Sequence, residues 1–448
     1  MKSTNICIIG GGSRQWAISF MKDLMLKEMT SGHIALYDID FEAAKNNESV
    51  ARRMFKINKA ENRFSVDAVE SAEKALTEAD LVIISIEPGD TRYRFGDLVL
   101  PEQYGILQTV GDTTGPGGLF RARRALPVFF EYARLIEKCC PNAWVINYTN
   151  PMTLCTAALY KAFPNIKAFG CCHEVFHLEE FIAHLAEKWF GVEKIDRHEI
   201  NVNITGVNHF TWFTSASWNG IDLMPRLKEL ANKAQTFADK TDIAKQRIAE
   251  EKWFDCDQLI SLELLRRFGA LGAAGDRHLA EFVPWFLSDE EKLHTYGVIR
   301  TPYAWREAEA KRKREKQFTD EELIAKPSGE EGVEIMRALM GDQTLITNMN
   351  MPNIGQITYL PKGHIVETNG VLSANSVRPL IAEEPPTAVK ALVSRIASEQ
   401  EIALNAIWEN DDEKLFEAFL LDPLMKLPIA TARELFNNMI DFANSNVR

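Results

Sequence analysis

A cysteine and a histidine give the first indication of chemistry in this sequence. Cys172 lies in the segment GCCHE at residues 170–174, directly after a short apolar run, and His209 ends the segment GVNH at 206–209. A thiolate and an imidazole together are typical ligands of a divalent metal ion. A cysteine near a helix N-terminus is also expected to have a lowered pKa and some thiolate character. On spacing alone, two core residues remain the favoured interpretation, because the pair is widely separated in the chain.

A glycine-rich turn follows the first apolar run, Asn5–Ile9, and precedes an expected helix. The turn consists of Gly10, Gly11, Gly12 and Ser13. Glycines let the backbone approach a pyrophosphate, and the N–H groups of the helix face its negative charge. Asp38 ends the second apolar run and can accept hydrogen bonds from both ribose hydroxyls, which favours NAD over NADP. Gln15 stands where the third glycine of the usual fingerprint would fall, and the alternative is a structural turn that binds no nucleotide.

Two further polar segments contain candidate site residues. Asn150 lies in NYTNPM at 147–152, where its amide suits the hydroxyls of a sugar or of the nicotinamide ribose. The alternative is a plain turn, since Asn-Pro is a turn dipeptide. Asp112 lies in the loop GDTTGPGG at 111–118, which leads into a helix with three arginines. This loop could close over a nicotinamide, or it could simply precede a solvated basic helix.

A cluster of ionisable residues lies near residue 280. It consists of Asp276, Arg277, His278 and Glu281. Ionisable groups so close together are candidates for acid–base catalysis. A surface ion-pair network is an equally good interpretation of the same cluster.

The composition excludes several classes of protein. The chain has 448 residues, of which 46% are hydrophobic and 25% charged, so it can form a large core and is not expected to be disordered. A net charge of −12 argues against nucleic acid or an anionic membrane as the main partner. The N-terminal apolar run is too short for a signal peptide, and no run is long enough to span a membrane. Seven cysteines without framework spacing predict reduced thiols and a cytoplasmic protein.

Short apolar runs alternate with amphipathic stretches over the first 200 residues. Strands are expected at Asn5–Ile9, Ile34–Tyr37, Leu81–Ile86, Trp144–Asn147 and Lys167–Gly170. Helices are expected at Gln15–Glu28, Phe41–Phe55, Ser71–Thr77, Phe120–Lys138 and Leu154–Ala162. This rhythm predicts an α/β fold with a doubly wound parallel sheet.

The pattern changes after residue 200. Residues 201–218 alternate in polarity and predict an antiparallel pair of strands around Gly206. Residues 225–270 are expected to be mostly helical, and the mixed charges of 305–325 predict a solvated helix. We therefore expect two domains: residues 1–200, which bind the dinucleotide, and residues 201–448, which contact substrate and metal and mediate oligomerisation.

Taken together and in this order, the motifs resemble those of glycoside hydrolase family 4, the NAD- and metal-dependent glycosidases. The motifs are GGGS at 10–13, Asp38, GDTTGPGG at 111–118, NYTNPM at 147–152, GCCHEV at 170–175, GVNHFTW at 206–212 and NIGQI…LP…VET at 353–368. Within the family, GCCHEVF, AAGDRHLAEF and SGEEGV are most similar to the members that act on α-galacturonides. The 6-phospho-glycosidase branch has an acidic residue where this chain has His173.

The resemblance implies a fold, an activity and two cofactors. The fold is a Rossmann-type domain followed by an α+β substrate domain like that of the lactate and malate dehydrogenases. The activity is exo-cleavage of short α-galacturonides, in which NAD takes hydride from sugar C3, a base removes the C2 proton, the aglycone leaves, water adds and the hydride returns. The second cofactor is Mn²⁺ or another divalent ion, which stabilises the enediolate. The family also implies a homodimer or homotetramer.

The resemblance also implies roles for individual residues. Cys172 and His209 bind the metal, and Asn150 binds sugar hydroxyls near it. His173 is the acid for the leaving group, and Asp112 lies near the reacting carbons. The remaining roles are the C2 base, assigned to Asp276 with His278 as the alternative, and the cation for the uronate carboxylate, assigned to Arg277. Two other activities remain open at this point: α-glucuronidase with the same mechanism, and a plain NAD-dependent 2-hydroxy acid dehydrogenase.

Overall fold

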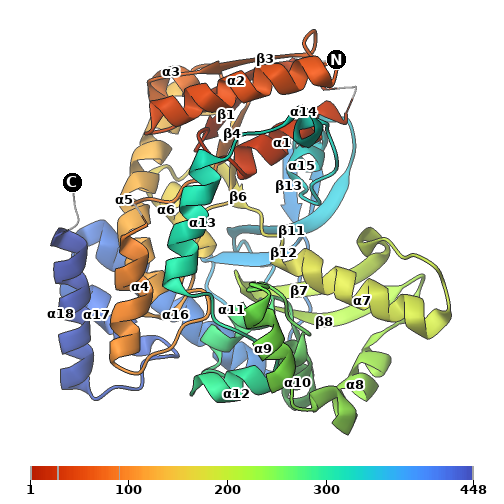
Figure 1. The fold of residues 1–448 in the computed structure, drawn as a ribbon, viewed down its shortest axis with the longest axis vertical. Coiled ribbons are helices and arrows are strands. Elements are labelled where there is room, and N and C mark those ends of the chain that lie inside the picture. The colour runs from red at the N-terminus through yellow and green to blue at the C-terminus, as the bar shows by residue number, and fades with distance from the viewer. Residues whose placement is uncertain (1–2, 28–29, 90, 446–448) are drawn as a thin grey trace.

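The computed structural model describes residues 3–27, 30–89 and 91–445. Its main element is a sheet of nine strands in the order β13-β12-β11-β6-β5-β4-β1-β2-β3 (Figure 1). The six parallel strands are β1 (Thr4–Ile9), β2 (Gly32–Tyr37), β3 (Phe64–Ala68), β4 (Leu81–Ile84), β5 (Trp144–Asn147) and β6 (Lys167–Gly170). Their order, 3-2-1-4-5-6, is that of the dinucleotide-binding Rossmann fold. The expected α/β fold with a doubly wound parallel sheet is therefore confirmed.

Helices cover both faces of this sheet, which explains why its strands are nearly continuous apolar runs. All four residues of Leu81–Ile84 are buried, because each face of β4 packs against helices. The helices of this part are α1 (Trp16–Met25), α2 (Phe41–Ile57), α3 (Ala72–Leu76), α4 (Tyr93–Gln103), α5 (Gly115–Cys139), α6 (Met152–Ala162) and α7 (Glu174–Phe190). The strand β3 and the helix α4 were not among the expected elements.

Three late strands extend the same sheet beyond β6. They are β11 (Leu345–Pro352), β12 (Ile365–Ser373) and β13 (Ser376–Pro379), all paired antiparallel. Asn350 of β11 lies opposite Gly170, the last residue of β6. Residues from the far end of the sequence thus lie beside the strand that leads to Cys172.

A second, smaller sheet holds the other half of the candidate site. It consists of β7 (Ile200–Val207), β8 (Phe210–Trp218), β9 (Ile221–Asp222) and β10 (Leu271–Gly272). The predicted antiparallel pair is present, but its turn lies at Asn208 and His209 and not around Gly206. Gly206 is itself paired within the ladder, with a φ of +142°, and a Cβ there would lie 2.4 Å from the carbonyl oxygen of Phe210. Its glycine therefore serves close strand pairing and not the turn.

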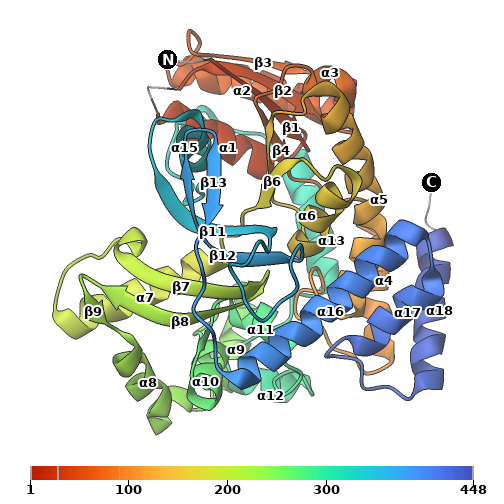
Figure 2. The same cartoon turned by 180° about the vertical axis from the view of Figure 1, so that it is seen from behind.

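The two sheets touch and the remaining helices surround them. The side chain of Asn369 on β12 accepts a hydrogen bond from the N–H of Ile204 on β7, and Figure 2 shows these strands side by side. The remaining helices are α8 (Met224–Asn232), α9 (Thr241–Ala249), α10 (Leu259–Phe268), α11 (Asp276–Phe282), α12 (Glu290–Thr295), α13 (Tyr303–Glu315), α14 (Asp320–Leu323), α15 (Gly332–Met340), α16 (Thr387–Glu409), α17 (Asp412–Leu421) and α18 (Ile429–Ser445), with 3-10 turns at Arg197–Glu199 and Ala234–Phe237. The predicted solvated helix is α13, none of whose residues is fully buried. Among the described residues, no helix is long and apolar enough to cross a membrane.

Candidate active site

The glycine turn lies between β1 and α1 and is held in place by backbone contacts. Gly10 and Gly11 each donate a backbone hydrogen bond to the carbonyl oxygen of Tyr37. Gly10 has a φ of +97°, and a Cβ there would lie 2.0 Å from the carbonyl oxygen of Ser85. The Oγ atom of Ser13 accepts a hydrogen bond at 3.1 Å from the N–H of Trp16, the first residue of α1. The turn therefore presents bare backbone at the N-terminus of a helix.

Asp38 completes this turn from the end of β2. Its Oδ2 accepts a hydrogen bond from the N–H of Gly12 at 2.9 Å, and burial raises its pKa. Behind the turn, the buried side chain of Asn47 on α2 donates hydrogen bonds to the carbonyl oxygens of Gly11 and Ser13. No sequence signal marked Asn47, because it lies in the middle of an ordinary amphipathic helix. The structure thus brings together all the residues predicted for the dinucleotide.

Cys172 and His209 meet at the carboxyl edge of the large sheet. The Sγ atom of Cys172 lies 3.1 Å from Nε2 of His209. Cys172 follows β6, and His209 lies in the tight turn between β7 and β8. The other ring nitrogen of His209, Nδ1, lies 3.0 Å from the hydroxyl of Thr113. That contact leaves Nε2 facing the sulfur.

The ionisation of this pair differs in part from the sequence-based expectation. Burial, together with Glu367 and Glu174, raises the pKa of Cys172 well above its usual value, so position near a helix N-terminus does not by itself favour the thiolate. Burial and the neighbouring His278 lower the pKa of His209 to about 3, which keeps the imidazole neutral. A neutral imidazole is the form that binds a metal ion, and a bound cation is what would draw the proton from the thiol.

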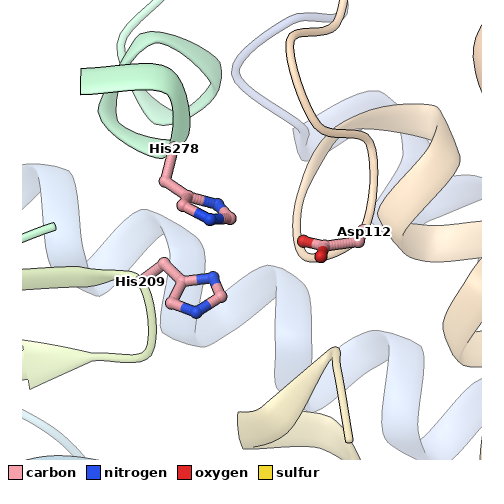
Figure 3. A group of neighbouring side chains, drawn as sticks. All are labelled: Asp112, His209 and His278. Atoms are coloured by element: carbon pink, nitrogen blue, oxygen red, sulfur yellow. The ribbon is translucent and has the colours of Figure 1, made fainter. Parts of the chain in front are cut away.

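Asp112 and His278 stand opposite this pair. Figure 3 shows the rings of His209 and His278 next to each other with the Asp112 carboxylate facing them, and the ring centroids of the histidines are 4.0 Å apart. Possible ligand atoms of all three residues lie within 4.8 Å of one another. The three side chains come from the β7–β8 turn, from α11 and from the segment 111–118. The predicted loop 111–118 is a loop only as far as Thr114, because α5 begins at Gly115.

Charges around Asp112 keep its carboxylate ionised. Burial opposes ionisation, but the neighbouring His278 and Arg121 outweigh it and hold the pKa of Asp112 below its ordinary value. One Asp112 oxygen accepts a hydrogen bond from Thr113 at 2.7 Å, and the other accepts one from the amide of Asn150 at 3.3 Å. The Oδ1 atom of Asn150 is buried without a partner among the described residues. An unpaired buried acceptor in a site is suited to a ligand hydroxyl.

Arg121 connects the Asn150 segment to Glu87, which follows β4. Its Nε donates to the backbone oxygen of Asn150 at 2.9 Å, and its Nη1 lies 3.1 Å from Oε1 of Glu87. Arg94 also pairs with Glu87. Although burial opposes ionisation, these two arginines lower the pKa of Glu87 to about 2. Both arginines thus share one carboxylate partner, Glu87, and hold this part of the site together.

The structure places the predicted base Asp276 away from this cluster. Its Oδ1 accepts a hydrogen bond from the N–H of Ser261 in the first turn of α10, at 3.0 Å. Burial raises the pKa of Asp276 to about 7. The side chain of Gln258, at the N-cap of α10, makes no capping hydrogen bond, so Asp276 supplies that contact from a distant position. His278, the alternative base, is the member of this segment that reaches the cluster.

The other two predicted residues, His173 and Arg277, lie outside the cluster of Asp112, His209 and His278. His173 is about half exposed, with 49% of its side-chain surface accessible, and its Nδ1 lies 3.5 Å from Glu330. Arg277 is buried and donates to the backbone oxygen of Thr109 at 2.9 Å and to the hydroxyl of Thr301 at 2.7 Å. Arg277 therefore contacts the backbone of Thr109, just before the loop that holds Asp112.

Three carboxylates support the cluster without having been assigned individual roles from the sequence. Glu174 lies 3.7 Å from His278 and accepts a hydrogen bond from the N–H of Gly275 at 2.8 Å. Glu281 accepts hydrogen bonds from the N–H groups that lead into the loop 111–118, at 2.7 and 2.9 Å. Glu281 was already named as a member of the ionisable cluster, but without a role of its own, whereas Glu174 was not singled out although it follows the cysteine motif directly.

Glu367 is the third of these carboxylates, and it lies behind the cysteine. It accepts hydrogen bonds from the amides of Asn208 at 3.0 Å and Asn348 at 2.6 Å. Asn348 also donates to the backbone oxygen of Cys172 at 3.0 Å. The motif VET contains Glu367, but nothing in the sequence indicated that β12 would join the sheet of β6 through β11.

Comparison with known proteins agrees with this geometry over nearly the whole chain. The model of the family 4 glycosyl hydrolases matches residues 5–188, and that of the C-terminal domain of the same family matches residues 204–425. The chain belongs to glycoside hydrolase family 4. The motif-based resemblance to this family is therefore confirmed.

Individual relatives resemble this chain over nearly its whole length. A Bacillus subtilis protein named α-galacturonidase is 44% identical over 97% of this chain and 96% of its own length. A protein of the same name from Thermoanaerobacterium saccharolyticum is 42% identical over 97% of this chain and 95% of its own length. A crystal structure from B. subtilis has a TM-score of 0.91 at 42% identity, covering 98% of this chain and all of its own.

More distant solved structures share the fold alone. A 6-phospho-α-glucosidase from gut microorganisms, solved in complex with NAD and Mn²⁺, has a TM-score of 0.80 at 20% identity over 99% of both chains. Lactate dehydrogenase of Eimeria maxima has a TM-score of 0.53 at 16% identity, over 92% of this chain and 97% of its own. The predicted likeness in fold to that dehydrogenase class is thus confirmed.

Proposed function

We propose that this family 4 hydrolase is an exo-acting α-galacturonidase, which releases galacturonic acid from short α-galacturonides. The observation that carries the proposal is the meeting of Cys172 and His209 beside Asp112 and His278. This arrangement offers a metal pair and ionisable groups at one point of the carboxyl edge of the sheet, where ligands of such folds bind. Relatives of nearly equal length that bear the name α-galacturonidase support the choice of substrate.

The glycine turn and Asp38 fit NAD as the first cofactor. A Cβ at Gly10 or Gly12 would collide with neighbouring atoms, so the backbone itself is the surface that a pyrophosphate would contact. The Asp38 carboxylate lies beside Gly12, where it can accept hydrogen bonds from the ribose hydroxyls. A 2′-phosphate would face the same carboxylate, which favours NAD over NADP.

Cys172 and His209 fit a divalent ion such as Mn²⁺ as the second cofactor. A sulfur and an imidazole nitrogen 3.1 Å apart can contact one ion, and Thr113 fixes which nitrogen faces the sulfur. When bound, NAD supplies the acceptor and later the donor of the C3 hydride, while the ion supplies a Lewis acid for sugar oxygens. The buried Asn150 amide is placed to bind a sugar hydroxyl next to the ion.

The remaining residues are assigned to proton transfer. We assign removal of the C2 proton to His278, because its ring lies in the cluster while the Asp276 carboxylate faces α10. Glu174 lies 3.7 Å from His278 and can stabilise the protonated ring. The exposed position of His173 suits an acid that protonates a departing aglycone. Asp112 accepts a hydrogen bond from Asn150, and we assign it to positioning the sugar so that C2 and C3 face the reacting groups.

The test is hydrolysis of p-nitrophenyl α-D-galacturonide, with NAD, Mn²⁺ and a reductant that protects the thiol. We expect turnover that needs both cofactors and leaves no net NADH. The α-D-glucuronide, which differs only at C4, is the matched substrate, and faster turnover of the glucuronide would overturn the substrate assignment. Net NADH formation without release of p-nitrophenol would instead indicate a plain 2-hydroxy acid dehydrogenase.

The assembly and organisation of the protein follow as further proposals. We propose a cytoplasmic homodimer or homotetramer, as the family resemblance implies, built from units 1–200 and 201–448. Light scattering tests the assembly, and a mass of 50.7 kDa, that of a single chain, would contradict it.

A further inference from the structure

Arg306 is a partly buried cation that contacts the backbone just before the loop holding Asp112. It lies on α13, and its Nη2 is 3.4 Å from the backbone oxygens of Thr109 and Val110. Its Nε is buried and has no hydrogen-bond acceptor among the residues that the structure describes. Within the described ranges, no carboxylate lies at ion-pair distance from this side chain. A buried N–H of a guanidinium that has no acceptor is costly, so this environment favours an anion.

Arg277 is a second cation of the same kind at the same place. Its Nη2 donates to the same backbone oxygen of Thr109, at 2.9 Å, so the two guanidinium groups converge on one atom. Its Nε is also buried, and no acceptor for it lies in the described part of the chain. Two cations that share one neutral acceptor repel each other, and a carboxylate between them would remove that repulsion.

Other buried arginines near the site show the usual arrangement. Arg121 pairs with Glu87, and Arg124 pairs with Asp97 at 2.6 Å. Only backbone and hydroxyl oxygens accept hydrogen bonds from Arg277 and Arg306 in the part of the chain that the structure describes. Arg277 and Arg306 therefore differ from Arg121 and Arg124, because among the described residues no carboxylate accepts a hydrogen bond from either of them.

The location is next to the reacting cluster. Thr109 and Val110 lead directly into the loop that holds Asp112, and Asp112 and Glu281 both act on the charge of Arg306. Burial, together with Arg94 and Arg277, lowers the pKa of Arg306 to about 9. An anionic group bound there would reverse this effect.

We propose that Arg306 and Arg277 together bind the C6 carboxylate of the uronide, and that Arg306 determines the preference for an acidic over a neutral sugar. This inference rests on the proposed function and deepens it. Two planar guanidinium groups match the two oxygens of a carboxylate. Arg277 also holds the Thr109 backbone in place, so Arg306 is the residue whose removal tests recognition with less effect on the loop.

The test compares binding of D-galacturonate, D-galactose and galactose 6-phosphate to the enzyme loaded with NAD and Mn²⁺, by calorimetry. We expect Arg306→Met to weaken galacturonate binding by roughly 10- to 100-fold, the usual effect of losing a charge-assisted hydrogen bond. Galactose binding should change by less than about twofold, because the lost contact is to the carboxylate alone. Arg306→Lys keeps the charge but not the fork, and should give an intermediate loss.

The matched control is Arg312→Met on the same helix. Arg312 pairs with Glu309 and 60% of its side chain is exposed, so this variant should bind all three sugars like the original enzyme. Equal weakening of galacturonate and galactose in both Arg306 variants would overturn the proposal in favour of a structural role. Tighter binding of galactose 6-phosphate than of galacturonate by the original enzyme would overturn the carboxylate as ligand.

Failure of this inference can be separated from failure of the proposed function. If the original enzyme cleaves the galacturonide and Arg306→Met keeps its preference over the galactoside, the arginine assignment is wrong and the function stands. If the original enzyme cleaves neutral α-galactosides faster than galacturonides, both are wrong. Thermal unfolding of each variant checks that loss of binding is not loss of fold.

Discussion

At the scale of single residues, two adjacent cysteines provide an internal comparison. Cys172 faces His209, whereas Cys171 is buried in the core beneath the sheet. We expect Cys172→Ser to lose Mn²⁺ binding and activity while NAD binding and the fold remain, because the glycine turn and Asp38 are separate from the metal pair. Calorimetric titration with Mn²⁺ measures the first effect and titration with NAD the second.

Cys171→Ser is the matched control for that substitution. It should retain Mn²⁺ binding and lower the stability by about 1–3 kcal/mol, the usual cost of placing a hydroxyl in an apolar core. Loss of Mn²⁺ binding in Cys171→Ser together with its retention in Cys172→Ser would show that the ligand assignment is wrong.

The raised pKa of Asp276 predicts how stability changes with pH. Burial raises the folded-state pKa to about 7 from an ordinary value of 3.8, so folding favours the protonated acid. This stabilisation is fully present below pH 3.8 and is lost as the pH rises through about 7. Asp276→Asn keeps an uncharged side chain at every pH and retains the acceptor for Ser261.

We therefore expect Asp276→Asn to match the original protein near the acidic end and to exceed its stability at higher pH. The difference above about pH 8 should reach on the order of 4 kcal/mol, by linkage of the pKa shift to unfolding. Urea denaturation at a series of pH values measures it. A variant whose relative stability falls as the pH rises would contradict this account.

Site residues could be predicted where they lie in short sequence motifs. They could not be predicted where their role depends on contacts with segments far away in the sequence. Cys172, His209 and Asp112 lie in contiguous segments whose residue types already suggested chemistry. Glu367 acts on Cys172 only because β12 pairs with β11 and β11 with β6, which no local pattern indicates. Asp276 was predicted as a base from its neighbours in sequence, but its contacts depend on where α10 begins.

At the scale of elements, the loop 111–118 is the part that joins the two halves of the site. Its entry is held by Glu281, whose carboxylate accepts from Val110 and Gly111. Its exit is held by Asp422, which accepts from the N–H of Gly115 at 2.6 Å and from the hydroxyl of Thr114 at 3.2 Å. The loop is therefore fixed by two carboxylates from distant segments, in line with the low mobility that positioning of Asp112 requires.

We expect Asp422→Ala to lower activity although Asp422 does not touch the cluster. Removing this acceptor leaves the N–H of Gly115 buried without a partner, at a cost of about 1–3 kcal/mol in stability. Asp112 should then be less well positioned, so that kcat falls more than NAD affinity. Asp412→Ala, which removes an exposed carboxylate paired with Arg123, is the control and should change neither. A kcat in Asp422→Ala equal to that of the control would contradict the role of this anchor.

Elements could be predicted where the periodicity is strong and the strand is buried on both faces. The strands β5 and β6 have the predicted bounds, because each is a short apolar run between turn residues. The strand β3 alternates buried and exposed positions at the sheet edge and gave no apolar run to recognise. The predicted position of the β7–β8 turn was wrong because Gly206, which suggested it, lies within β7 and serves strand pairing.

At the scale of the whole molecule, the candidate site requires both halves of the chain. Cys172 and Asp112 come from the segment that matches the first family model, whereas His209 and His278 come from the segment that matches the second. The glycine turn lies on the sheet, and the small sheet brings His209 to its edge. A reaction that needs a hydride acceptor, a metal ion and a base at one sugar is therefore suited to this fold in a way that a two-carboxylate glycosidase is not.

This arrangement predicts an isotopic signature for the complete reaction. If C3 is oxidised and the C2 proton is removed before the aglycone leaves, galacturonic acid released in D₂O should carry deuterium at C2. Mechanisms through an oxocarbenium ion never break the C2–H bond and leave C2 protiated. Substrate deuterated at C2 should react more slowly where proton removal limits the rate. Proton NMR of the product and rate comparison of the two substrates measure the two effects.

The same experiment assigns the base. We expect His278→Ala to abolish the C2 label, because its ring lies in the cluster with Asp112 and His209. Asp276→Asn should retain it, because that carboxylate faces the first turn of α10. Retention of the label in His278→Ala with its loss in Asp276→Asn would return the role to the aspartate. A product without label, from a reaction that also shows no C2 isotope effect, would contradict C2 deprotonation itself. Absence of the label alone would not, because a base that shields its proton from solvent prevents labelling but leaves the isotope effect.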